Sequence, residues 1–144
     1  MLNHQLEVKK TTDPEMLKKV FDIRRTVFIE EQHCPPEMEW EYDEESTHFL
    51  AFVNGNAAGT ARWRKTEQGI KLERFAVLKD YRGIGVGSAL VENVLADIRP
   101  APGDQVCLHA QIMAIPLYER FGFVKENNPF EEAGILHYKM VLHR

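Results

Sequence analysis

A strand, a glycine-rich loop, a long helix and a second strand follow one another between residues 72 and 110, and this unit constrains the fold most. The segment LERFAV, Leu72 to Val77, predicts a strand, and YRGIGVGSAL comes shortly after it. From Val86, apolar residues recur at helical spacing until two prolines end the run, and Val106 to Ala110 predicts a buried strand. Because a helix crosses between them, the two strands are expected to be parallel, with a right-handed crossover.

The rest of the chain predicts antiparallel strands and further helices around this unit. Asp13 followed by Pro14 is typical of a helix start. Strands are predicted at Leu6–Lys10, Thr47–Val53, Gly59–Lys65 and Ile135–Leu142, a hairpin turn at Asn54–Asn56, and a short helix at Ala114–Phe121. We therefore expect an α/β (α+β) fold, a mixed sheet with helices on its faces, in a single domain over residues 1–144.

Composition narrows the classes of function. The 144 residues include 18 basic and 22 acidic ones, so the chain lacks the basic surplus of a general nucleic-acid binder. Cys34 and Cys107 are too far apart for a metal-type pair, which argues against a disulfide framework and a zinc site. No stretch approaches the roughly 18 apolar residues of a membrane span, and the first residues lack the apolar core of a signal peptide. We expect a soluble, cytoplasmic protein that binds no metal, nucleic acid or membrane.

The glycine-rich loop predicts an anion site. Glycines let backbone N–H groups turn inward, and the helix that follows aims its unpaired N–H groups at the same place. A nucleotide P-loop needs lysine and then serine or threonine after its last glycine, but Gly87 is followed by Ser88 and an alanine. The spacing of the dinucleotide fingerprint fails as well, which argues against ATP and NAD. What remains is Arg82-x-x-Gly85-x-Gly87, or a turn that holds no ligand.

In its surroundings, this pattern resembles the pyrophosphate-binding signature of the GNAT superfamily of acetyl-CoA-dependent N-acetyltransferases. LERFAVLKDYRGIGVGSALV looks like the family's fourth strand, loop and helix, and LHAQIMAIPLYERFGF looks like its fifth strand and following helix. RRTVFIEEQHCPPEMEWEYDEES, GTARWR and AGILHYKM are similar to the small bacterial branch called ElaA-like. The resemblance implies a mixed, mostly antiparallel sheet of six to seven strands, whose splayed parallel pair forms the CoA cleft.

The resemblance also implies where acetyl-CoA binds. The pantetheine arm is expected to pair with the backbone of Phe75, Ala76 and Val77. The pyrophosphate is expected on the backbone N–H groups of Arg82, Gly83, Ile84, Gly85, Val86, Gly87 and Ser88. The guanidinium of Arg82 can add positive charge there, although an arginine in an exposed loop is commonly just solvated. Gln111 stands where the family most often has asparagine, and its longer side chain could still reach the pantetheine amide.

Glu73 is the first candidate for the base that removes a proton from the acceptor amine. Strand alternation predicts that its side chain shares a face with Phe75 and Val77, among apolar residues. Such a position in a cleft would raise the pKa of the carboxyl group and suit it to accept a proton. The alternative is a glutamate at the end of a strand that pairs with a neighbouring cation.

Two further side chains are candidates for the site. Tyr118 matches the family tyrosine whose hydroxyl lies near the thioester sulfur, which implies a general acid for the leaving thiolate; plain core packing is the alternative. His137 could line the acceptor pocket or act as an alternative base, because neutral imidazole accepts a proton near neutral pH. A packed, hydrogen-bonded histidine is the more ordinary role.

The acceptor is expected to be an amine. An acidic segment from Glu30 to Glu45 would attract a cation, or is simply a solvated loop. Arg62 and Arg64 share a strand face and could pair with these acids or hold an acceptor carboxylate. We expect acetyl transfer to a small-molecule or protein amine by direct attack in a ternary complex, by a monomer or homodimer. The alternative is a non-catalytic acyl-CoA-binding sensor or interaction module of the same fold.

Overall fold

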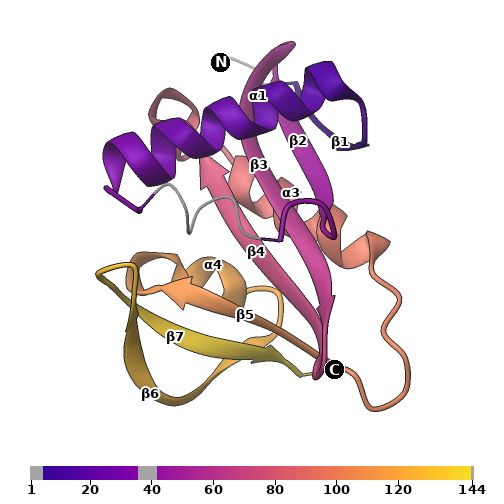
Figure 1. Cartoon of the computed structure of the whole chain (residues 1–144), viewed down its shortest axis with the longest axis vertical. Helices are drawn as coiled ribbons and strands as arrows, with labels where there is room; N and C mark the ends of the chain where they lie inside the picture. The colour runs from indigo at the N-terminus through magenta and orange to yellow at the C-terminus, as the bar shows by residue number, and fades with distance from the viewer. Residues whose placement is uncertain (1–4, 36–41, 144) are drawn as a thin grey trace.

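The computed structural model describes residues 5–35 and 42–143, which form one mixed sheet with helices on both faces (Figure 1). Its seven strands run in the order β1-β2-β3-β4-β5-β7-β6. Their bounds are β1 Leu6–Thr11, β2 Thr47–Val53, β3 Asn56–Thr66, β4 Gly69–Val77, β5 Gln105–Gln111, β6 Phe123–Glu132 and β7 Ile135–Leu142. Within these ranges only β4 and β5 pair in parallel, so the predicted mixed, mostly antiparallel fold is confirmed.

Helices cover the two faces of the sheet. α1 (Pro14–Arg24) continues into a π-helical stretch, η1 (Arg25–Glu31), and crosses one face over β2, β3 and β4 (Figure 1). α3 (Val86–Asp97) packs on the other face. Asp13 begins α1 as predicted, because its carboxylate accepts a hydrogen bond of 3.1 Å from the Met16 amide. Within the described ranges, no helix has the length and apolar character needed to cross a membrane.

Each face has its own core. The α3 side buries Leu90, Val91 and Val94 of the helix against the apolar residues of the strands. The α1 side buries Val20, Ile23, Val27 and Phe28 against Leu50 and Ala76. Apolar residues at helical spacing on α1 and α3 pack on apolar residues that alternate along the strands. The helical and strand periodicities predicted from the sequence therefore account for the cores on both faces.

The parallel pair separates after a few residues. β4 and β5 are paired only from Gly69 opposite Gln105 to Leu72 opposite Leu108. Beyond that point β4 remains paired with β3, and β5 remains paired with β7, so the two halves of the sheet diverge (Figure 1). The splayed parallel pair that the family resemblance implied is therefore confirmed.

A bulge in β4 resets the direction of its side chains. Thr60 pairs with Ala76 but Arg62 pairs with Glu73, so β4 has one extra residue, and Arg74 takes a left-handed φ of 58°. Phe75 and Val77 consequently pack with the core on the α3 side. Glu73 faces Arg62 on the α1 side of the sheet. The prediction that Glu73 shares a face with Phe75 and Val77 is wrong, because the bulge breaks the alternation.

Two elements differ from the sequence prediction at the C-terminal end. β6 was not predicted, because its sequence FVKENNPFEE is polar, half exposed and interrupted by a register shift between Glu126 and Phe130. As an edge strand it needs no apolar alternation on its solvent side. The predicted short helix is reduced to α4 (Ile115–Glu119), which follows a 3-10 turn, η3 (Ile112–Ala114).

Candidate functional site

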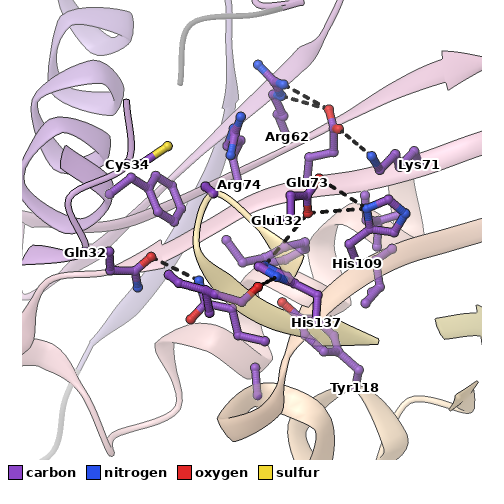
Figure 2. Close-up of a pocket in the computed structure, with 18 of the residues that line it drawn as sticks. Gln32, Cys34, Arg62, Lys71, Glu73, Arg74, His109, Tyr118, Glu132 and His137 are labelled. Carbon is purple, nitrogen blue, oxygen red and sulfur yellow. Dashed lines mark hydrogen bonds and ion pairs between the residues drawn. The ribbon is translucent and has the colours of Figure 1, made fainter. Parts of the chain in front are cut away.

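A cavity of about 390 Å³ lies where β4 and β5 separate. Its lining comes from η1, β3, β4, β5, η3, α4, β6 and β7, so segments far apart in the sequence meet there (Figure 2). Polar side chains from β3 and β4 lie at one part of it, a cluster of histidine and glutamate at another, and Tyr118 below them in the view (Figure 2). The cavity brings together seven of the predicted site residues: Arg62, Arg64, Glu73, Phe75, Gln111, Tyr118 and His137.

Glu73 holds three cationic side chains. Its carboxylate accepts a hydrogen bond of 2.8 Å from Arg64 Nε, and it lies 3.0 Å from Arg62 Nη2 and 3.2 Å from Lys71 Nζ. Burial alone would raise the pKa of this carboxyl group, but the hydrogen bond from Arg64 and the charges of Arg62 and Lys71 lower it to about 2. The expected rise of the Glu73 pKa is therefore wrong. Of the two predicted environments, the structure has the one in which a neighbouring cation pairs with the glutamate.

Arg62 is fixed by a second carboxylate. Its Nη1 donates a hydrogen bond of 2.7 Å to Asp43, and Arg24 Nη1 donates one of 2.6 Å to the same oxygen. The Arg62 side chain is 1% exposed, and burial lowers the pKa of its guanidinium. Arg64 stacks over the Tyr42 ring at 3.8 Å. The arginines thus pair with acids, one of which, Asp43, comes from the predicted acidic segment; Glu37, Glu39 and Glu41 lie outside the described residues.

Tyr118 lies in the wall of the cavity and in the core on the α3 side. Its ring makes edge contacts with Phe75 at 5.6 Å and Phe123 at 6.2 Å between centroids, and the residue is 6% exposed. Burial raises the pKa of the hydroxyl group, which therefore stays protonated at neutral pH. Core packing, which was the alternative to the role of general acid, is present, and the residue also lines the cavity.

The glycine-rich loop turns at two left-handed residues before α3. Gly83 has a φ of 81° and Gly85 a φ of 94°, and Gly85 begins the helix without a side-chain cap. A Cβ at Gly83 would meet no atom within 4 Å, so space is open beside the loop. An uncapped helix start beside open space is a place where an anion can bind.

Arg82 is tied to the protein rather than only solvated. Its Nε donates a hydrogen bond of 2.9 Å to the Val77 carbonyl, and its Nη2 lies 3.0 Å from the Glu31 carboxylate. The guanidinium thereby links the end of β4 to η1. One of the three residues predicted to pair with pantetheine, Val77, already has a donor at its carbonyl oxygen.

Gln111 reaches across the opening. Its Nε2 donates a hydrogen bond of 3.0 Å to Oε1 of Gln32, which follows η1. The side-chain amide predicted to meet pantetheine therefore has a partner within the protein. Both glutamines line the cavity, so their bond joins the two sides of the divergence between β4 and β5.

Two residues that the sequence analysis missed join His137. His109 Nδ1 lies 3.4 Å from both oxygens of Glu132, and His137 Nε2 lies 3.8 Å from one of them (Figure 2). The hydrogen bond with His109 lowers the pKa of Glu132 despite burial, and the charges of Lys71 and His137 add to this effect. His109 alternates with Gln111 in its strand and could have been found from that spacing. Glu132 lies in the unpredicted strand β6.

Comparisons with known proteins identify the family. The model of the acetyltransferase (GNAT) domain matches residues 8–144. A Bacillus subtilis (strain 168) protein that carries the name of an acetyltransferase is 36% identical over 94% of this chain and 95% of its own length.

Two solved structures share the fold. Escherichia coli ElaA superposes with a TM-score of 0.80 at 24% identity, over 96% of this chain and all of that one. A GNAT family acetyltransferase from Elizabethkingia anophelis, solved with acetyl-CoA bound, gives a TM-score of 0.63 at 16% identity over 94% of each chain. At these identities the likeness shows the fold alone, while the match of the family model covers nearly the whole chain. The chain belongs to the GNAT acetyltransferase family.

Proposed function

We propose that the protein transfers the acetyl group of acetyl-CoA to a primary amine by direct attack within a ternary complex. The observation that carries this proposal is the opening between β4 and β5, which has Tyr118 in its wall and the glycine-rich loop at the end of β4. The Elizabethkingia anophelis family member with this fold was solved with acetyl-CoA bound, which supports the choice of cofactor.

Backbone groups are proposed to hold the cofactor. The N–H groups of residues 82–88 would bind the pyrophosphate, since Gly85 leaves the start of α3 without a side-chain cap. The arm would pair with the edge of β4 that β5 has left at Phe75, Ala76 and Val77, beside the Arg82 donor that already occupies the Val77 carbonyl. Binding of the pantetheine arm to Gln111 would either break the Gln32–Gln111 hydrogen bond or leave it in place beside the arm.

Tyr118 is proposed to stabilise the leaving thiolate. An ordinary alkyl thiol such as that of cysteine has a pKa of about 8.5, and burial raises the pKa of Tyr118 above its ordinary value of 10.0. A group that holds its proton more tightly than a thiol does acts as a hydrogen-bond donor to the departing sulfur. The hydroxyl therefore lowers the barrier to C–S cleavage without itself becoming a phenolate.

Glu73 is proposed to hold the strands around the site in place. This role replaces the predicted role of Glu73 as the base. A carboxylate with a pKa of about 2 is a weak proton acceptor near neutral pH. Its contacts with Arg62, Arg64 and Lys71 instead fix the strands at the point where β4 leaves β5. We further infer a cytoplasmic setting, since both cysteines are buried free thiols.

The proposal is tested by following thiol release from acetyl-CoA across a panel of small amines, amino acids and peptides with free N-termini or lysines. We expect turnover with at least one acceptor and formation of one acetylated amine per thiol released. CoA binding without transfer to any amine would favour the non-catalytic acyl-CoA-binding module instead.

A further inference from the structure

We propose that His137 accepts the proton of the acceptor ammonium group and that Glu132, held by His109, places a negative charge beside the protonated ring. This inference rests on the proposed acetyl transfer. It assigns roles to residues on the side of the same cavity where the acceptor would bind. All three residues line the cavity together with Tyr118 (Figure 2). They come from three neighbouring strands, β7, β6 and β5, which the sheet order places side by side.

The ring of His137 is oriented for proton transfer. Its Nδ1 lies 2.7 Å from the Ile135 carbonyl oxygen, and since a carbonyl only accepts, Nδ1 carries the hydrogen. The lone pair of the neutral ring is therefore on Nε2. Phe130 stacks on the ring with 6.1 Å between centroids and 23° between planes, which holds the ring in its orientation.

Glu132 is placed to stabilise the protonated ring. Its Oε2 lies 3.8 Å from His137 Nε2, beyond hydrogen-bond distance, so a carboxylate lies beside the nitrogen that takes the proton. His109 Nδ1, at 3.4 Å, approaches the same carboxylate from β5. The neutral ring is thus free to take a proton from the acceptor, and the charged ring has an anion beside it.

Glu132, the carboxylate beside His137, is the most exposed of the three side chains. The exposed fraction is 10% for His137, 27% for His109 and 41% for Glu132. A proton accepted by the buried ring therefore has a route to solvent past a carboxylate that water reaches.

Other charged and titratable groups also line the cavity. They are Arg62 and Arg64 of β3, Lys71, Glu73 and Arg74 of β4, Tyr118 of α4, Cys34 after η1, and Tyr42. The charge of Lys71 lowers the pKa of Glu132 as well. Glu73 has three cations on its carboxylate and Tyr118 keeps its proton, so neither offers the open lone pair that His137 Nε2 has.

The proposed steps balance in atoms and charge. The ammonium group gives one proton to His137 Nε2, and the freed nitrogen lone pair attacks the thioester carbon. The C–S bond breaks, and its electron pair leaves with the thiolate. A second proton from the attacking nitrogen neutralises the sulfur, while the proton on His137 leaves to water. The products are the amide, free CoA and one released proton.

The test measures the pH profile of kcat/KM with an amine that the wild type acetylates. We expect His137→Gln to lower kcat/KM about 100-fold and to abolish the acidic limb of the profile, with unchanged CoA affinity by calorimetry. Glu132→Gln should lower the rate less and move the acidic limb to lower pH, because the protonated ring loses its neighbouring anion. His109→Gln should lower kcat without moving KM for acetyl-CoA.

Matched controls separate this role from a structural one. Glu131→Gln, an exposed neighbour on β6, and His143→Gln, an exposed histidine beyond β7, should leave the profile unchanged. Free imidazole should restore part of the activity of His137→Gly. Activity of His137→Gln within about threefold of wild type, or an acidic limb that stays in place, would overturn the assignment and leave the acetyl transfer standing. Absence of turnover by the wild type with every amine would instead contradict the proposed function and this inference with it.

Discussion

Arg62 on β3 and Glu73 on β4 are cross-strand partners whose ion pair, 3.0 Å from Nη2 to Oε1, lies one residue beyond the last pairing of β4 with β5. The Arg62 side chain is 1% exposed and that of Glu73 is 12% exposed. The pair therefore fixes the base of the opening in which we place the chemistry. Its energetics can be measured without any knowledge of the acceptor.

Removing the charge of Glu73 should destabilise the fold. Glu73→Gln leaves Arg62 buried without one of its carboxylate partners, which should lower the free energy of unfolding by about 3 kcal/mol. Urea denaturation at neutral pH measures this loss. Glu67→Gln, in the exposed turn between the same two strands, should change the free energy by less than about 0.5 kcal/mol. Equal losses of unfolding free energy for the two substitutions would show that the Arg62–Glu73 pair does not stabilise the fold.

The contribution of Glu73 should depend on pH in one direction. Its pKa in the folded protein is about 2, below the ordinary value of 4.5, so its stabilisation is present above pH 4.5 and is lost as the pH falls toward 2. The difference in unfolding free energy between wild type and Glu73→Gln should shrink as the pH is lowered from about 5 to about 3. A difference that stays constant over this range would show that the carboxylate is not held by its cations.

The hydroxyl of Tyr118 can be removed without disturbing its ring contacts. Tyr118→Phe keeps the contacts with Phe75 and Phe123, so we expect a fall in kcat of about 10- to 100-fold with little change in KM for acetyl-CoA. The rate of thiol release at saturating substrate measures kcat. Tyr138→Phe, a partly buried tyrosine on β7 outside the cavity lining, is the control and should retain activity. Full activity of Tyr118→Phe would remove the hydroxyl from the mechanism.

Gly69 sits where β4 and β5 begin to pair. A Cβ there would lie 2.2 Å from the Gln105 carbonyl oxygen and 2.5 Å from its nitrogen, which are backbone atoms that cannot move aside. Gly69→Ala should therefore lower the melting temperature strongly. Gly103→Ala is the control for left-handed backbone strain alone, since its φ is 88° and no atom lies within 4 Å of its Cβ. The free energy of unfolding of Gly103→Ala should fall by only about 1 kcal/mol.

The elements could be predicted where side-chain pattern and turn residues agree. β2 and β7 were predicted with their observed bounds, because apolar residues define both strands and turns limit them. β6 could not be found, since its solvent-facing residues have no apolar period. The bulge at Arg74 also has no sequence signal, because the left-handed position is occupied by an arginine instead of a glycine.

The site was harder to predict than the fold. A single extra residue in β4 turned Glu73 toward three cations and reversed the expected direction of its pKa. The contact between His109, Glu132 and His137 depends on a strand that the sequence did not predict and on the register of β6 with β7. Family resemblance supplied candidate residues, but their electrostatic environment came only from the arrangement of neighbouring strands.

The most direct test of the central claim is a calorimetric titration of the protein with CoA. We expect one molecule to bind per chain, and Gly83→Asp to weaken binding at least tenfold by placing a negative charge in the proposed pyrophosphate site. Gly103→Asp, which has a similar positive φ and equally open space far from the loop, should bind CoA like the wild type. No detectable binding by the wild type, or equal binding by all three proteins, would contradict the assignment of this loop to the cofactor.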